Sequence, residues 1–276
     1  MFGPPESVCA LLAGLREGGV GFGKFEILLG DNSENGWSEN LFEEIEVVRV
    51  VRCKKPGSYA ARNVLSKAAK GDWLVFTDAD CLPEPGWVDH LLEGQKIDEL
   101  RAGRVKMEVM EGRRTLFACY DQVKGIPQEH YVARGYAATA NLSVPRKVYE
   151  RLGGFDERRY SGGDADFCRR AVAAGFQLSY RPEAVVRHAA RTRWYELARK
   201  VRRLRGGQIV GHRGAMRSYR VLRSFLPPAT HWFRYLRETR HPWRDRWVAC
   251  AVEAALWPIG VWESLRLLAG KPPERR

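Results

Sequence analysis

Two aspartates one residue apart, Asp78 and Asp80, follow the apolar run Trp73–Thr77. A run of aromatic, aliphatic and β-branched residues predicts a buried strand, and open α/β sheets place ligands at the carboxyl ends of their strands. Two carboxylates this close repel each other unless a cation lies between them, and hard oxygen ligands suit Mg²⁺ or Mn²⁺. The pair therefore predicts a divalent-metal site. A solvated turn is the alternative, because Asp is common in turns.

A second acidic cluster, Asp164 and Asp166, follows Gly162 and Gly163 at the start of a helix expected over residues 164–174. A carboxylate held opposite a metal–phosphate centre can take a proton from an attacking hydroxyl, which would make Asp164 a general base. A structural N-cap is the alternative role for Asp164, because Asp is a preferred capping residue.

Strands and helices alternate around the first cluster, and this order predicts a parallel sheet wrapped by helices. Before Asp78, helices are expected at residues 6–15 and 59–69, and strands at 25–29, 45–51 and 73–77. After Asp80, helices are expected at 87–92, 115–123, 145–152 and 164–174, and strands at 103–110, 177–180 and 184–187, with a strand or loop at 136–143.

The charge divides the chain into two parts. Residues 191–276 contain 20 Lys/Arg, six Asp/Glu and six of the nine tryptophans, a net charge of +14, whereas residues 1–190 carry −1. We expect a catalytic domain at 1–190 and a basic, Trp-rich helical extension at 191–276, suited to a membrane surface, a nucleic acid or a charged substrate. The 45% apolar content excludes wholesale disorder. Six scattered cysteines without C-x-x-C spacing predict reduced thiols in a cytosolic protein.

Residues 247–270 are the most apolar part of the chain, but Glu253, Pro258, Gly260 and Glu263 interrupt them. A spanning helix needs about 20 mainly apolar residues. We therefore expect a pair of interfacial helices with Trp and Leu on one side and Arg on the other, not a transmembrane segment. The alternative is that these helices only pack on the catalytic body.

Taken together, the motifs up to about residue 207 resemble the family 2 glycosyltransferases of the GT-A fold. Asp31 matches the acidic residue that follows the family's second strand, and Arg62 matches its helix arginine. The other matching stretches are the D-x-D pair at 78–80, Asn141 followed by Gly153-Gly154-Phe155, Gly163-Asp164-Ala165-Asp166-Phe167, and His188 at a strand end. The resemblance implies an α/β fold with a mixed, mostly parallel sheet flanked by helices.

The same resemblance implies a role for each matching residue. Asp164 would be the catalytic base. The nucleotide sugar would be bound by Asp31, Arg62, Asp78 and Asp80, and the acceptor or its sugar by Asn141, Gly153, Gly154, Phe155 and Asp166. The metal, Mn²⁺ or Mg²⁺, would be held by Asp78, Asp80 and His188. For His188 alone, an ordinary hydrogen-bonded histidine is the alternative.

The implied activity is inverting transfer of a sugar from a nucleotide-diphosphate sugar, with a UDP-sugar favoured, to a carbohydrate or lipid-linked acceptor of the cell envelope. Processive relatives carry Q-x-x-R-W after the base, and residues 200–204 lack both Gln and Trp, so we expect a non-processive enzyme. The basic tail predicts a peripheral location on the inner face of the plasma membrane, against anionic lipid.

The sequence departs from the family pattern in two further places. Residues 1–5 look like the end of a first central strand whose body is missing, and Gly163 stands where the family usually has Glu.

Two rival functions are weaker. A haloacid-dehalogenase-type phosphatase also uses D-x-D after an apolar strand, but Leu82 stands where that class has Thr or Val, and its nucleophile normally lies near the N-terminus. A non-enzymatic nucleic-acid-binding protein would explain the basic tail, but residues 1–190 carry no excess positive charge and no nucleic-acid motif is present, so nucleic acid is not an expected partner.

Overall fold

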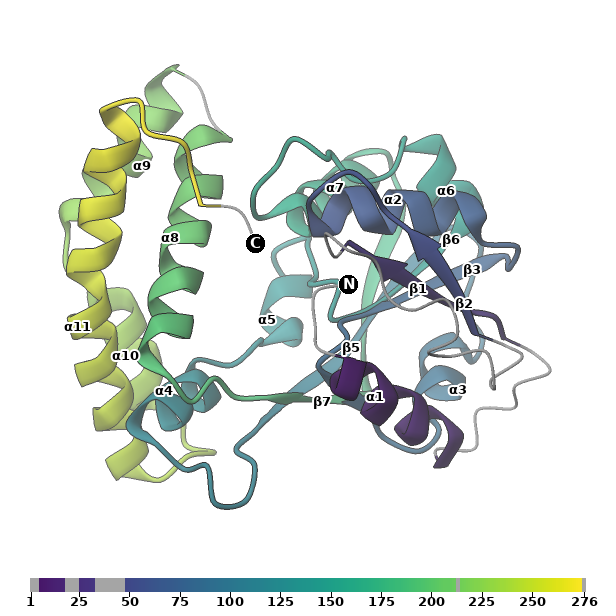
Figure 1. The fold of residues 1–276 in the computed structure, drawn as a ribbon, viewed down its shortest axis with the longest axis horizontal. Coiled ribbons are helices and arrows are strands. Elements are labelled where there is room, and N and C mark those ends of the chain that lie inside the picture. Colours follow the sequence, from purple (N-terminus) through teal and green to yellow (C-terminus); the bar gives the residue numbers. More distant parts are fainter. Residues whose placement is uncertain (1–4, 18–24, 33–47, 212–213, 275–276) are drawn as a thin grey trace. The chain divides into compact units, whose positions relative to one another are not determined.

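The structure is a computed structural model that describes residues 5–17, 25–32, 48–211 and 214–274. It comprises two compact units (Figure 1). Unit 1 is made of Met1–Lys106, Ile126–Glu157 and Gly163–His188, and unit 2 of Met107–Gly125, Arg158–Gly162 and Ala189–Arg276. The chain passes from unit 1 to unit 2 for the last time after His188, close to the expected domain boundary at 190. Two short segments before it also join unit 2, because they pack on the C-terminal helices.

Unit 1 contains two sheets. Strands β1 (Ile27–Asp31) and β2 (Val48–Arg52) pair in parallel. A five-stranded sheet has the order β3-β6-β5-β7-β4, with bounds β3 Trp73–Thr77, β4 Cys81–Pro83, β5 Glu99–Glu108, β6 Asn141–Pro145 and β7 Gln177–Ala189. The pairs β3–β6, β5–β6 and β4–β7 are antiparallel. The expected α/β class and mixed sheet are confirmed, but the sheet is less parallel than expected, because strand–helix alternation holds only before Asp78.

A cavity of about 230 Å³ lies between β1 and β3. It is lined by Phe25, Glu26 and Leu28 next to or within β1, by residues 73–76 of β3, and by Leu65 of helix α2 (Ser58–Ala68), among others. Among the described residues, no strand bridges β1 and β3, so the two ladders are separate. The Glu26 carboxylate accepts the N–H of Gly71 (3.0 Å) and of Lys70, which ties the start of β1 to the turn before β3. Residues 1–4, most of the expected strand remnant, lie outside the described residues.

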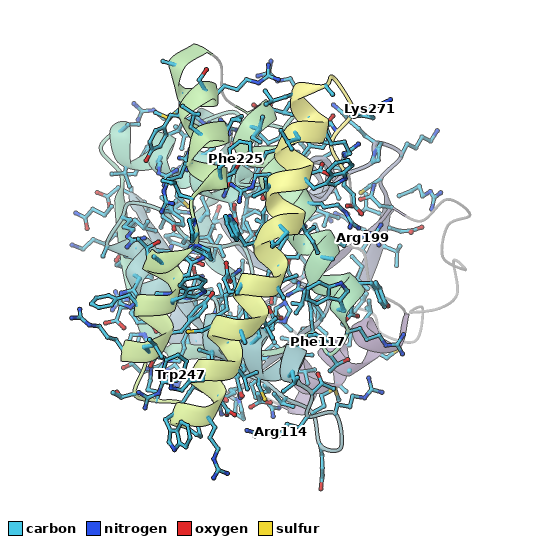
Figure 2. All side chains as sticks on the ribbon, turned by 90° about the vertical axis from the view of Figure 1, so that its left-hand side faces the viewer. Arg114, Phe117, Arg199, Phe225, Trp247 and Lys271 are labelled. Carbon is cyan, nitrogen blue, oxygen red and sulfur yellow. The ribbon has the colours of Figure 1, made fainter. Side chains whose placement is uncertain are left out.

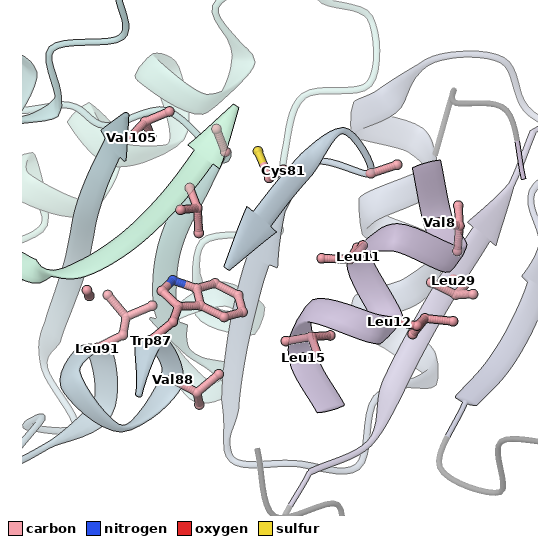
Figure 3. Packing of buried hydrophobic residues seen from close by; sticks show 14 residues of the cluster. Val8, Leu11, Leu12, Leu15, Leu29, Cys81, Trp87, Val88, Leu91 and Val105 are labelled. Carbon is pink, nitrogen blue, oxygen red and sulfur yellow. The ribbon is translucent and has the colours of Figure 1, made fainter. Parts of the chain in front are cut away.

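The first helix, α1 (Pro5–Glu17), supplies one core of unit 1. Its Val8, Leu11, Leu12 and Leu15 recur at helical spacing and are buried. They cluster with Leu29 of β1 and with residues of β4, β7 and helix α3 (Trp87–Leu92) (Figure 3). A second, aromatic core joins β3 and β6 to helices α2, α6 (Arg146–Arg151) and α7 (Gly163–Ala173). The short helix α5 (Gln128–Val132) precedes β6.

Unit 2 is helical. It contains α4 (Leu116–Lys124), α8 (Trp194–Val210), α9 (Gly214–Phe225), α10 (Ala229–Arg237) and α11 (Trp243–Leu268). Helix α11 packs against the other four (Figure 1). The expected break at Pro258 and Gly260 is wrong, because α11 continues through both. Pro258 is exposed, so its ring lies away from the packed face of the helix.

Helix α11 is long and apolar enough to cross a membrane by length and composition, but 44% of its most apolar window is buried inside the protein.

Candidate active site

The D-x-D pair begins where β3 ends, and helix α2 places a cation beside its first member. Arg62 Nη2 lies 2.6 Å from Asp78 Oδ1, and both side chains are mostly buried. A hydrogen bond between two charged groups is about twice as strong as a neutral one. The contact therefore orients Asp78 toward α2 and partly neutralises its charge. The family resemblance assigns both residues to one nucleotide-sugar site, and the structure places them side by side.

Asp80 meets a different set of side chains. Cys81 in β4 pairs with His188 in β7, and Asp80 precedes it, so the antiparallel register brings the three together. His188 Nε2 lies 3.5 Å from Asp80 Oδ2, and the ligand atoms of Asp80, Cys81 and His188 all lie within 4.8 Å of one another. His188 is buried and Asp80 is partly exposed.

This group fits a hard divalent cation. Burial, followed by the negative charges of Asp78 and Asp80, raises the pKa of the Cys81 thiol. Sulfur is also a soft ligand that hard cations do not prefer, so Cys81 is the weakest donor of the three. The remaining donors are a carboxylate oxygen and an imidazole nitrogen, which suit Mn²⁺ or Mg²⁺ with a substrate oxygen. Asp80 and His188 therefore lie together as predicted. Asp78 is not a member of this group, because its carboxylate faces Arg62.

Asp164 lies inside the first turn of α7, one residue after the helix begins. It therefore lies near the N-cap position, as the alternative interpretation also has it, and its catalytic role stays a prediction. Its Oδ1 accepts the N–H of Ala165 (2.9 Å) and the hydroxyl of Tyr59 (3.4 Å). Burial, and to a smaller extent the charge of Asp78, raises the pKa of Asp164 above its ordinary value, while the N–H of Ala165 and Arg62 oppose the rise. A raised pKa is typical of a carboxylate that accepts a proton in catalysis.

The glycine before Asp164 makes room for Tyr59. A Cβ atom on Gly163 would lie 2.8 Å from the Tyr59 ring. The backbone of α7 can approach that ring only because Gly163 has no side chain. The Tyr59 ring thus occupies the space beside Asp164 where the family pattern usually has a Glu side chain.

Asp31 ends β1 and is buried. Its Oδ2 lies 2.5 Å from Nη1 of Arg52, the residue opposite it in the parallel β1–β2 pair. The carboxylate thus has a cation from its own sheet as a partner. Its expected contact with a nucleotide base stays a prediction.

Asn141 does not have the expected acceptor role. Its side chain is wholly buried. Its Nδ2 donates to the carbonyls of Ala184 (2.8 Å) and Arg104 (2.9 Å), and its Oδ1 accepts the Trp87 indole N–H (2.9 Å). These contacts use both amide protons, so Asn141 joins three strands and α3 and leaves no donor for a sugar.

Phe155 and Gly154 are also structural rather than sugar-binding. The Phe155 ring is 3% exposed and packs on Tyr59, Phe76, Tyr149 and Phe167. A Cβ on Gly154 would lie 2.7 Å from Asn63 Oδ1, so the close approach that Gly154 permits is to the protein itself.

The other two expected acceptor residues have different surroundings. A Cβ on Gly153 would meet no described atom within 4 Å, so the backbone there faces open space. Asp166 Oδ2 accepts from Arg170 Nε one turn later at 3.0 Å. Contact of either residue with an acceptor stays a prediction.

Two residues whose roles the motifs did not indicate, Tyr59 and Asn63, support the site. Tyr59 lies one helical turn before Arg62, so its position on the same face of α2 could have been found from spacing. Asn63 accepts from the Phe155 N–H (2.9 Å) and donates to Phe155 O (2.8 Å) and Glu157 Oε1 (3.0 Å). It thereby fixes the loop after α6 to α2, and no sequence pattern indicates such a long-range contact.

Comparisons with known proteins agree with this geometry. Residues 5–111 match the family description "Glycosyl transferase family 2". Glycosyltransferase AglE of Haloferax volcanii is 32% identical over 197 residues, covering 67% of this chain and 63% of the relative. The pre-mycofactocin glycosyltransferase of Mycobacterium tuberculosis is 32% identical over 169 residues, 57% of this chain and 35% of the relative. The chain thus spans less than two thirds of these relatives.

A solved structure shows the same fold. Mannosyltransferase PcManGT from Pyrobaculum calidifontis, in complex with GDP-Man and Mn²⁺, superposes with a TM-score of 0.55 at 16% identity, covering 98% of this chain and 72% of that one. With D-x-D at the end of β3 and Asp164 at the start of α7, the chain has the GT-A fold and belongs to the family 2 glycosyltransferases.

Proposed function

We propose that this protein is a glycosyltransferase that moves a sugar from a nucleotide-diphosphate sugar to an acceptor hydroxyl, with inversion and with dependence on a divalent cation. The observation that carries the proposal is the arrangement of Asp164. This carboxylate lies in the first turn of α7, accepts the Tyr59 hydroxyl at 3.4 Å, and is within electrostatic reach of Arg62 and of Asp78, the residue that follows β3. A proton acceptor thus lies beside a site suited to a metal and a diphosphate.

Each side chain has a defined task in this proposal. Asp80 and His188 would hold the cation, which when bound neutralises charge on the departing diphosphate. Arg62 keeps Asp78 fixed at the end of β3, where Asp78 can accept hydrogen bonds from the nucleotide. Asp164 takes the proton of the acceptor hydroxyl. Direct displacement with one base and no covalent intermediate inverts the anomeric carbon.

The proposed donor is a nucleotide-diphosphate sugar. The sequence favours a UDP-sugar, and the relative with the same fold was solved with GDP-Man and Mn²⁺. Both nucleotides therefore belong in the first screen, each with Mn²⁺ and with Mg²⁺. We propose a carbohydrate or lipid-linked envelope precursor as acceptor, non-processive transfer, and a peripheral site of action on the inner face of the plasma membrane.

A donor-hydrolysis screen tests the proposal. Purified protein is incubated with UDP- and GDP-sugars, with Mn²⁺, with Mg²⁺ or with EDTA, and the released nucleotide diphosphate is measured. We expect release from one donor class only when metal is present. Asp80→Asn should remove that release, and Asp89→Asn, an exposed carboxylate on α3, should leave it unchanged. Metal-independent release, or no release from any donor, would overturn the proposal.

A further inference from the structure

The outward face of α11 is apolar along most of its length. Its exposed positions from 247 onward follow helical spacing and carry no charge until the helix ends: Trp247, Ala251, Ala255, Pro258, Trp262, Leu265 and Leu268. Trp247 is 58% exposed and Trp262 is 66% exposed. We call this set the outer face of α11. From Trp247 to Leu265 it is about 27 Å long.

The neighbouring helices extend the apolar surface. Helix α9 exposes Met216, Tyr219, Leu222 and Phe225 at intervals of three residues, and Phe233 of α10 is also exposed. Both helices contact α11. Figure 2 shows α11 crossing the side of the molecule that faces the viewer, with Trp247 near one end and Phe225 on α9. Exposed apolar side chains gathered on α11 and on two helices that contact it indicate an interaction site.

The opposite face of α11 is fixed to the protein by one buried carboxylate and by packing on α4 and α8. Glu253 accepts hydrogen bonds from the hydroxyls of Tyr120 (2.6 Å) and Tyr235 (2.8 Å) and from Lys124 Nζ (3.2 Å), and contacts His231 Nδ1 (2.8 Å). These contacts place α4, α10 and α11 around one charge. Surrounding α11 with lipid would break all of them and leave a charge in hydrocarbon, which is costly.

Glu263 is a second buried carboxylate of α11, and its ion-pair partner lies within the same helix. It is wholly buried and pairs twice with Arg266, at 2.7 and 2.8 Å. The helix therefore has one side committed to unit 2 and one side available. Such a helix can lie in the plane of a membrane interface, but it cannot cross the bilayer without losing its contacts with the other helices of unit 2.

The positive charge around this surface favours an anionic partner. Residues 191–276 carry a net charge of +14. Arg237 stacks over the Phe233 ring at 3.9 Å and Arg244 over the Trp243 ring at 5.6 Å, so cations border the apolar surface. Exposed Trp and Leu side chains on one face, with arginines beside them, are typical of a helix that lies in a membrane interface. A second copy of this chain would bring two strongly basic surfaces together, which the repulsion disfavours.

We propose that the outer face of α11 docks unit 2 onto an anionic lipid bilayer, with the helix lying in the plane of the interface. Apolar side chains enter the acyl boundary, and the bordering arginines contact lipid phosphates. This inference does not depend on the proposed reaction, because it rests only on residues of unit 2.

Vesicle flotation tests the proposal on the full chain. Vesicles contain phosphatidylcholine alone or phosphatidylcholine with phosphatidylglycerol. We expect the wild type to float with the anionic vesicles and to be released by high salt. The double variant Trp247→Glu/Trp262→Glu should lower the partition coefficient at least about tenfold, since each exposed indole contributes apolar area. Ile97→Glu, at an exposed apolar position of unit 1, is the matched control and should float like the wild type.

Several outcomes would overturn the proposal. These are no flotation of the wild type, equal flotation of the double variant, or resistance to alkaline extraction, which would indicate a spanning helix. A dimer seen by light scattering and abolished in the double variant, without vesicle binding, would assign the surface to a second copy. The folded state of each variant is checked by its melting temperature. Hydrolysis of a soluble donor should be unchanged in the double variant, so failure of docking is distinguishable from failure of the proposed reaction.

Discussion

The ring of Tyr59 occupies the space that a side chain on Gly163 would need: a Cβ there would lie 2.8 Å from the ring. Gly163→Ala should therefore lower the free energy of unfolding by about 1–3 kcal/mol, because overpacking displaces a buried ring. Urea unfolding measures the change.

The matched control for this substitution is Gly71→Ala. A Cβ on Gly71 meets only a backbone oxygen at 3.6 Å, an ordinary contact, so its effect should stay within about 0.5 kcal/mol. Equal effects of the two substitutions would show that the Tyr59–Gly163 contact is loose in solution.

Asp164→Asn should separate activity from stability. Loss of the base should reduce turnover by about 10²- to 10⁴-fold without changing thermal stabilisation by nucleotide and metal. In the wild type, turnover should fall as the pH drops through the raised pKa of Asp164, because only the deprotonated carboxylate accepts a proton. Turnover by Asp164→Asn at the wild-type rate would remove Asp164 from the mechanism.

The same variant should be more stable than the wild type at neutral pH. A carboxyl whose pKa is raised by folding binds its proton more tightly in the folded state. Its ionisation therefore lowers stability as the pH rises from the ordinary value of 3.8 through the raised value. Asp164→Asn should accordingly raise the melting temperature at pH 7 and have little effect in acid. A melting temperature lowered at pH 7 would contradict the electrostatic account.

Substitutions of Asp80, Cys81 and His188 should differ in their effect on the apparent affinity for Mn²⁺. Asp80→Asn and His188→Ala should each weaken stabilisation by Mn²⁺ at least about tenfold in apparent affinity, since each removes a ligand atom. Cys81→Ser should leave the affinity unchanged, because sulfur is a soft ligand that a hard cation such as Mn²⁺ does not prefer. Thermal shift against Mn²⁺ concentration is the measurement. A large effect of Cys81→Ser would show that the sulfur is a ligand.

Asn141→Ala should destabilise the protein by about 2–3 kcal/mol, because it leaves the Trp87 indole and two strand carbonyls without their partner. The Michaelis constant for an acceptor should change little in the fraction that stays folded. A raised Michaelis constant with an unchanged melting temperature would restore the acceptor role that the motif suggested.

The local pattern was sufficient to predict most elements and the main groupings of the site. The apolar run at residues 73–77 predicted β3, and Arg62 with Asp78, and Asp80 with His188, lie together as expected. The roles of Asn141 and Phe155 could not be predicted in this way. A motif records which residues recur, but burial depends on strands and helices that are far apart in the chain.

The continuity of α11 was missed for a related reason. Pro258 and Gly260 disfavour a helix by intrinsic propensity, but packing on α4 and α8 outweighs a local preference. Tyr59 was missed although it shares a helix face with Arg62, because its role follows from the absent side chain of Gly163.

The separate β1–β2 ladder has a consequence for local unfolding of the protein. Among the described residues, β1 is joined to the rest of unit 1 by side-chain packing on α1 and α2 and by the Glu26 contacts, but not by a strand ladder to β3. A segment held in this way can open as its own cooperative unit, at a lower free energy than global unfolding. Amide protons of β1 and β2 should exchange with solvent ahead of those in β3 and β6. Asp31 is part of β1, so the residue expected to contact the nucleotide base would be reversibly released while the Asp80–His188 group stays assembled.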